Sequence, residues 1–253
     1  MSYGAWTMKH LLLLVVFSVF PLSLAAQDAK SIIKAAIDQY RGETSYTEME
    51  MVIHRPSWER TMAMKAWTKG LDQSLVRITA PKKDAGSGNL LLDNNMWSYT
   101  PKINRVIKIP SSMSNQSWMG SDFSNNDIAR ADDIIERYEH TLIKTESHQG
   151  KVVHVIEAIP HDDAPVVWGK ELMRVREDYV VLEHSFYDQD GKLVKTLKTT
   201  EVKNFSGREV PSIQRMQSVD KENEWTEVRI KEAKYGIKIS DRTFTLSNLR
   251  NPR

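Results

Sequence analysis

NLLLDNNMWSYTPKINRVIKIPSSMSNQSWMGSDFSNND is the sequence of residues 89–127, and this segment gives the clearest indication of the fold. Apolar runs at 90–92, 96–100 and 103–109 are separated by an Asp-Asn-Asn turn at 93–95 and by Pro101. Asn and Asp are common where a chain reverses, and proline has no N–H to donate to a neighbouring strand. The segment therefore predicts three short antiparallel strands.

The second half of this segment is a polar loop that carries four large apolar side chains. These are Met113, Trp118, Met119 and Phe123. Large apolar side chains in a loop are expected to contact either a core or a ligand, because their exposure to water is unfavourable. We predict that these four residues belong to a lid loop.

The flanking sequence extends the antiparallel pattern in both directions. Period-two alternation predicts strands at 49–54, 62–67 and 75–79 before the segment, and at 152–159, 166–176, 179–187, 193–205, 213–219 and 225–235 after it. Helical spacing predicts a helix at 28–40. Ser124 and Asp127 have the spacing of a reciprocal helix cap, which predicts a second helix that ends near residue 137.

These elements predict one α+β domain with about 11–12 antiparallel strands, a size at which accumulated twist curls a sheet. The expected architecture is a half-open antiparallel β-barrel with the helices covering its concave face. No repeat, low-complexity segment or long linker divides the chain.

The first 26 residues have the pattern of a secretory signal peptide. Lys9 and His10 precede an apolar run at 11–20, and small residues follow up to a cleavage site after Ala25 or Ala26. The run is shorter than the roughly 20 residues that a transmembrane helix needs. We therefore expect a periplasmic protein that is soluble after cleavage, with residues 27–253 as a single domain.

Composition excludes several classes of function. The chain has no cysteine, so disulfides, thiol nucleophiles and cysteine metal sites are absent. The net charge is +2 and there is no long basic run, so nothing in the composition favours a nucleic-acid partner.

Catalytic motifs are also missing. The sequence contains no nucleophile elbow, no HExxH pair and no phosphate-binding glycine loop. His161 with its two following aspartates is predicted to be a solvated turn rather than a metal site. A hydrolase that uses Asp122 and Asp127 is the remaining catalytic alternative, although helix capping already accounts for Asp127. We predict a protein with no enzymatic activity, no cofactor and no metal.

The positive signal is a concentration of methionine and tryptophan in the first half of the chain. Methionine is flexible and polarisable, so a surface lined by methionine can repack around varied guests, and aromatic rings add rigid area. An ordinary sheet core with methionine as filler is the alternative. A curled sheet of this size often encloses a ligand cavity. The candidate cavity residues are Met49, Met51, Met62, Met64, Trp67, Leu90, Leu92, Trp97 and Tyr99.

The sequence resembles a known family at several of these positions. The run at 96–109 resembles the strand pair of the LolA-like outer-membrane lipoprotein-sorting proteins. The segment at 112–127 is similar to the signature of a longer branch of that family, which is associated with membrane transporters. The N-terminal helix, the entry to a strand at Trp58 and the late segment around Phe244 occur in the same order, so the resemblance covers nearly all of residues 27–253.

This resemblance implies that residues 27–253 form a single LolA-like lipid-binding domain, an unclosed barrel whose helical lid covers a hydrophobic cavity. The cavity would shelter acyl chains of a lipid or lipoprotein that is carried between membrane partners towards the outer membrane. An inner-membrane transporter is the expected partner, and the carrier is expected to be a monomer. The alternative within the same fold is a periplasmic sensor or regulatory subunit that acts with a membrane transporter or signalling protein. The resemblance leaves open which of Arg55, Arg60 and Arg77, if any, lies at the cavity mouth.

Overall fold

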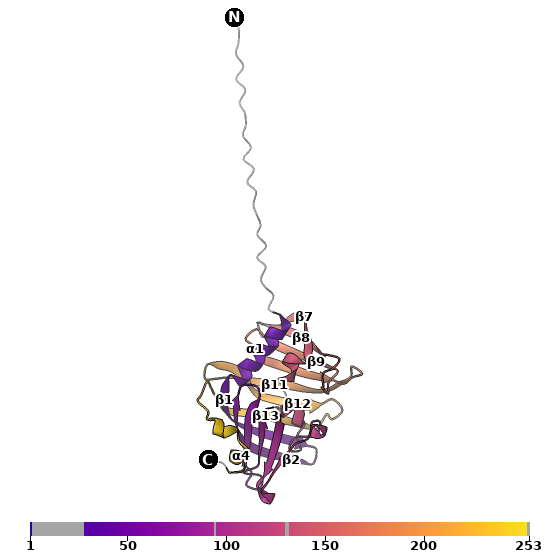
Figure 1. The fold of residues 1–253 in the computed structure, drawn as a ribbon. Helices are drawn as coiled ribbons and strands as arrows, with labels where there is room; N and C mark the ends of the chain where they lie inside the picture. The colour runs from indigo at the N-terminus through magenta and orange to yellow at the C-terminus, as the bar shows by residue number, and fades with distance from the viewer. Residues whose placement is uncertain (2–27, 94, 130–131, 252–253) are drawn as a thin grey trace.

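The computed structural model describes residue 1 and residues 28–93, 95–129 and 132–251. The predicted signal peptide lies, apart from residue 1, outside the described residues. The remainder is a large curved sheet with helices against its two faces (Figure 1).

Thirteen strands form one sheet in which every neighbouring pair is antiparallel. The first six strands are β1 (Thr44–Arg55), β2 (Trp58–Lys69), β3 (Gln73–Ala80), β4 (Gly88–Leu92), β5 (Asn95–Thr100) and β6 (Arg105–Lys108). The other seven are β7 (Tyr138–His148), β8 (Lys151–Pro160), β9 (Lys170–Arg176), β10 (Val181–Tyr187), β11 (Leu193–Phe205), β12 (Arg208–Ser218) and β13 (Trp225–Tyr235).

The helical elements are short except for the first. They are α1 (Ala29–Arg41), α2 (Asn125–Ala129), α3 (Asp133–Glu136) and α4 (Leu246–Arg250), with 3-10 turns η1 (Pro101–Ile103), η2 (Ser111–Met113) and η3 (Asp241–Phe244). The Asp28 side chain caps α1 by accepting a hydrogen bond from the Ser31 N–H at 2.8 Å. Gly42, with a φ of 63°, ends the helix.

Strands β6 and β7 follow one another in the sequence but lie at opposite edges of the sheet. The order is β6-β5-β4-β3-β2-β1-β13-β12-β11-β10-β9-β8-β7, so β6 and β7 form the two edges and the barrel is not closed. The chain therefore builds one half of the sheet outward from β1, crosses to the far edge, and returns to pair β13 with β1. The predicted half-open barrel is confirmed.

The strand that the sequence analysis missed is β7. Most of its side chains are exposed, and it lies at an edge with a partner on only one side. Without a buried face, a strand lacks the apolar–polar alternation that identifies strands in a sequence. Its charged residues are typical of an edge that resists pairing with other chains.

Two predicted boundaries also differ. The second helix was expected to run without a break to about residue 137, but the structure contains two short helices, α2 and α3. The strand expected at 166–176 begins at Lys170. The preceding turn lies between Pro160 and Pro165, and neither proline can donate to a ladder.

Alternation along the strands gives the sheet an inner and an outer face, both of which are partly covered. The inner face is the one that carries Met51 and Met64. Over β7–β9 this face is covered by α1 and α3, whose residues Ile32, Ile33 and Ile135 are at most 2% exposed. The outer face of β3–β6 is covered by η3 and α4.

Candidate functional site

A hollow of about 280 Å³ lies on the inner face between α1, the lid loop (residues 110–124) and the strands. Its wall is mostly apolar and includes Met49, Met51 and Met64 from one half of the sheet, and Leu197 and Val228 from the other. A volume of this size lies near the lower end of the roughly 300–1,000 Å³ typical of small-molecule pockets.

Four of the nine predicted cavity residues share the inner face. Met49, Met51 and Met64 line the hollow. Met62 is fully buried beside them in the same apolar cluster. Cross-strand pairing explains the grouping, because Met51 lies opposite Met62 and Met49 opposite Met64 in the antiparallel register of β1 and β2.

The other five predicted cavity residues do not line the hollow. Trp67, Leu90, Leu92, Trp97 and Tyr99 lie on the outer face, where they pack around Phe244 and Leu249 of the C-terminal segment. Successive side chains of a strand point to opposite faces, so Trp97 cannot share a wall with Met96. Their apolar character is explained by the cover of η3 and α4.

The lid loop contributes two residues to the hollow. Trp118 and Phe123 are 4% and 9% exposed and line the hollow. Met119 packs against the methionine cluster. Met113 is half-buried, and its carbonyl accepts a hydrogen bond from the Asn125 side chain at 3.0 Å.

Polar contacts fix the lid loop on the sheet. The indole N–H of Trp118 donates to the Asn89 side chain at 3.0 Å. The Arg55 guanidinium forms a bidentate pair with Asp122, at 3.0 and 3.2 Å. The Thr226 hydroxyl donates to the same carboxylate at 2.6 Å. Bidentate pairs of this kind combine strength with a defined geometry.

The three arginines left open by the sequence have different positions. Arg55 and Arg60 both contact the lid loop, since Arg60 donates to the Met119 carbonyl at 3.4 Å and pairs with Asp84 at 2.8 Å. Arg77 lies on the outer face. None of the three lines the hollow.

Asp127 has two roles. Its carboxylate accepts from the Ser124 N–H at 2.7 Å while the Ser124 hydroxyl accepts from the Asp127 N–H at 3.1 Å, which confirms the predicted reciprocal cap. The same carboxylate forms a buried ion pair of 2.5 Å with Lys195. Asp122 and Asp127 are thus both committed to structural contacts.

The end of the hollow next to α1 is more polar. Arg41 donates two hydrogen bonds to the Gly70 carbonyl and one to that of Leu71. Burial lowers the pKa of Arg41, although an arginine side chain stays protonated. Burial also raises the pKa of Tyr235 to about 12, so its phenol is neutral at pH 7. The charged groups of the wall are therefore already paired or hydrogen-bonded, and the open space is bordered mainly by hydrocarbon.

The second wall of the hollow was not predicted from the sequence. Residues of α1 and of the strands after β8 contribute Ile37, Met173, Leu197, Val228 and Ile230. Leu197, Val228 and Ile230 alternate with polar neighbours, which identified their strands but not the shared cavity. The sequence does not show that these strands face β1 and β2 across one hollow, because that depends on the order of the strands in the sheet.

The described residues contain neither a metal-binding cluster nor a membrane-spanning helix. No cluster of three or more His, Asp and Glu side chains there is arranged to hold a metal ion. The predicted turn at His161 is an exposed turn. No helix among the described residues combines the length and the apolar character needed to cross a bilayer.

Known structures share this fold. A DUF1329 family protein from Desulfovibrio piger is 26% identical with a TM-score of 0.77, and the match covers 87% of this chain and 98% of that one. A putative outer membrane lipoprotein-sorting protein domain from Vibrio parahaemolyticus is 22% identical with a TM-score of 0.77 and coverages of 88% and 98%. A LolA superfamily protein from Nitrosomonas europaea is 24% identical with a TM-score of 0.73 and coverages of 88% and 99%.

Sequence comparison gives a family but no characterised relative. No curated protein sequence matches this chain. A family model described only as that of an uncharacterized-protein-like family matches residues 70–251, which include most of the sheet and the whole lid loop. The chain therefore belongs to the family of this model, and its fold is the one seen in the LolA superfamily protein and in the putative lipoprotein-sorting domain.

Proposed function

We propose that this protein is a non-catalytic carrier that shelters an acyl chain of a lipid or lipoprotein in the inner-face hollow. The observation that carries the proposal is a hollow bordered by methionine, leucine and valine side chains that do not fill it. Flexible, polarisable methionines at Met49, Met51 and Met64 suit a guest whose shape varies, as acyl chains do.

The free energy available from such a site is sufficient for transport through water. Each buried methylene contributes about 0.8 kcal/mol, so burial of half of a twelve-carbon chain contributes on the order of 5 kcal/mol. This attraction requires no covalent chemistry. Release follows when a partner stabilises a state of the protein in which the hollow is less accessible to the guest.

Two positions of the lid loop provide the two states: one in which the hollow is accessible to the guest and one in which it is less accessible. Trp118 and Phe123 line the hollow, and Trp118 packs against the methionine cluster, so a guest that extends onto that cluster would compete with the Trp118 ring. A guest therefore binds more tightly when the loop moves outward. Differential affinity of the two loop positions is what couples binding to a partner.

We further propose that the carrier works as a monomer in the periplasm and exchanges its cargo with an inner-membrane transporter. The signal-peptide pattern at residues 1–26 supports the location. The resemblance of residues 112–127 to the transporter-associated branch supports the partner.

Ala66→Phe tests the proposal by filling the hollow. Ala66 lines the hollow and is 8% exposed. A phenyl ring there displaces at least two methylenes of a guest, about 1.6 kcal/mol, so a fluorescent fatty-acid probe should bind more than tenfold more weakly. Fluorescence titration of the purified protein lacking residues 1–26 measures this affinity.

Lys65→Phe is the matched control. Lys65 precedes Ala66 on β2, lies on the outer face and is paired with Glu48 at 3.0 Å, so this variant adds the same ring outside the hollow. Far-UV circular dichroism and thermal melting monitor the fold of both variants. Equal probe affinity in the two variants, or no probe binding and no co-purifying lipid in native mass spectrometry of the unmodified protein, would contradict the proposal.

A further inference from the structure

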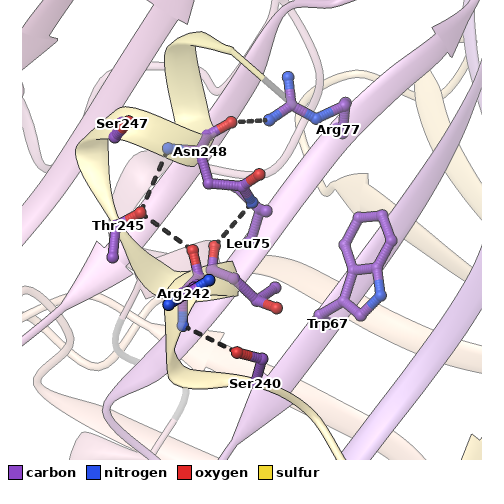
Figure 2. Close-up of a pocket in the computed structure, with 9 residues that line it drawn as sticks. Trp67, Leu75, Arg77, Ser240, Arg242, Thr245, Ser247 and Asn248 are labelled. Carbon is purple, nitrogen blue, oxygen red and sulfur yellow. Dashed lines mark hydrogen bonds between the residues drawn. The ribbon is translucent and has the colours of Figure 1, made fainter. Parts of the chain in front are cut away.

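A second pocket, of about 500 Å³, lies on the outer face, on the other side of the sheet from the hollow. Strands β2 and β3 form its floor, and the segment that contains η3 and α4 forms its rim. Figure 2 shows Arg77 and Trp67 on the floor, with Arg242, Thr245 and Asn248 on the rim. The carrier function proposed above does not use this pocket.

The pocket combines two arginines with hydroxyl and amide groups and has no carboxylate in its lining. Arg242 is exposed on the rim, and no ion pair joins it to another described residue. The nearest acidic residue in the sequence, Asp241, is paired with Lys69 at 2.5 Å. The positive charge of the pocket is therefore not neutralised locally by a side chain of the described chain.

Arg77 is a buried cation whose hydrogen-bond partners are all uncharged. It is 9% exposed and donates to the carbonyls of Gly86, Asn248 and Leu249 at 3.3, 2.7 and 3.2 Å. An arginine remains charged when buried, and a buried charge without a counter-charge is unfavourable. Carbonyl dipoles offset part of that cost, and an anion in the pocket would offset more of it.

The rim also supplies donors that suit an oxyanion. Ser240, Thr243 and Ser247 are lining residues that carry a hydroxyl group, whereas the hydroxyl hydrogen of Thr245 is already donated to the Arg242 carbonyl at 2.9 Å. Ser240 and Thr245 already cap the turns that follow them, which fixes the shape of the rim. Arginine and hydroxyl donors together are the usual partners of phosphate oxygens, because a guanidinium can donate two parallel hydrogen bonds to them.

We propose that this outer-face pocket binds a phosphoryl group, with Arg242 and Arg77 supplying the charge and the rim hydroxyls the remaining donors. Trp67 provides a flat apolar wall for the body to which the phosphoryl group is attached. The phosphoryl group can belong to an anionic phospholipid headgroup or to a soluble phosphate compound. The two sources share the same recognition chemistry.

Arg242→Gln tests the proposal without disturbing the core, since Arg242 is exposed. Two measurements are made at fixed low ionic strength: titration with inorganic phosphate, followed by calorimetry, and sedimentation with vesicles of phosphatidylglycerol or of phosphatidylcholine. We expect the unmodified protein to bind phosphate, phosphatidylglycerol vesicles or both. Arg242→Gln should weaken this binding about tenfold or more, since a hydrogen-bonded charge is lost.

Lys238→Gln is the matched control. Lys238 is exposed on the same C-terminal segment and does not line the pocket, so the variant removes an equal charge at a neighbouring place. Its affinity should stay within about twofold of that of the unmodified protein, because an exposed charge outside a site acts only through screened long-range attraction. Equal weakening by Lys238→Gln and Arg242→Gln would overturn the proposal, as would the absence of binding to both phosphate and phosphatidylglycerol.

The two arms identify the source of the phosphoryl group. Binding of phosphatidylglycerol vesicles but not of inorganic phosphate indicates a lipid headgroup. Binding of inorganic phosphate without vesicle binding indicates a soluble ligand. Neither result depends on whether the inner-face hollow holds an acyl chain, because Arg242→Gln alters only the outer-face pocket and Ala66→Phe alters only the hollow.

Discussion

Asp127→Asn is expected to lower the free energy of unfolding by about 3–5 kcal/mol, because it leaves a buried ammonium group without its counter-charge. The Lys195 and Asp127 side chains are 7% and 8% exposed. Lys195 also lies over the rings of Trp168 and Phe186, each at 5.0 Å. Asparagine can still accept the capping hydrogen bond from Ser124, so the substitution removes the ion pair and keeps the helix cap.

Urea denaturation followed by circular dichroism measures this loss. The double variant Asp127→Asn with Lys195→Met is the control, because the methionine removes the unpaired charge and keeps much of the apolar stem. Replacement of a buried ion pair by apolar groups is often nearly neutral, so the double variant should recover most of the lost stability. A loss below about 1 kcal/mol in the single variant would show that the pair contributes little.

Asp122→Ala is expected to release the lid loop and to cost about 3 kcal/mol. It removes the bidentate partner of Arg55, whose side chain is 13% exposed, together with the Thr226 contact. Glu224, 3.4 Å from the Arg55 Nε, remains as a partial counter-charge, so the cost should lie at the lower end of the range for a broken buried pair.

Amide hydrogen exchange locates the effect in the loop. The backbone N–H of Trp118 donates to the Phe123 carbonyl at 2.7 Å, so its exchange reports on the order of the loop. The backbone amides of the lid loop should exchange faster in the variant, while those of β8 and β9 stay protected. If the proposed carrier function is right, association of the fatty-acid probe should also accelerate. Glu59→Ala, which removes an exposed carboxylate from the neighbouring strand β2, should change neither quantity. Unchanged exchange in Asp122→Ala would mean that the remaining contacts, among them Trp118–Asn89 and Arg60–Met119, are enough to hold the loop.

The sequence predicted the features that depend on short-range patterns. Ser124 and Asp127 are three residues apart, and a reciprocal cap requires only that spacing and helical geometry. The turn at 93–95 and the break at Pro101 likewise separated β4, β5 and η1 where the structure has them. Each of these features is determined by residues that are neighbours in the chain.

The sequence does not show which side chains of β4 and β5 lie on the inner face of the sheet and which lie on the outer face. Alternation separates Met96 from Trp97, but it does not say which of the two meets the inner face. In most antiparallel sheets the polar side identifies the solvent. Here the C-terminal residues Phe244 and Leu249 cover the outer face, so both sides of β4 and β5 are apolar and the usual signal is lost.

The pairing of β1 with β13 has a consequence for how the chain folds. Removal of residues 225–235 would divide the sheet into two separate sheets, β1–β6 and β7–β12, because no other strand joins them. Strands β1 and β13 lie near opposite ends of the described chain, so their pairing joins residues that are far apart in the sequence. Such long-range pairing is intrinsically slow. Before β13 has been synthesised and has paired with β1, the methionines of β1 and β2 lie on a six-stranded part of the sheet that lacks its partner strands. A chaperone or a neighbouring chain can contact them there.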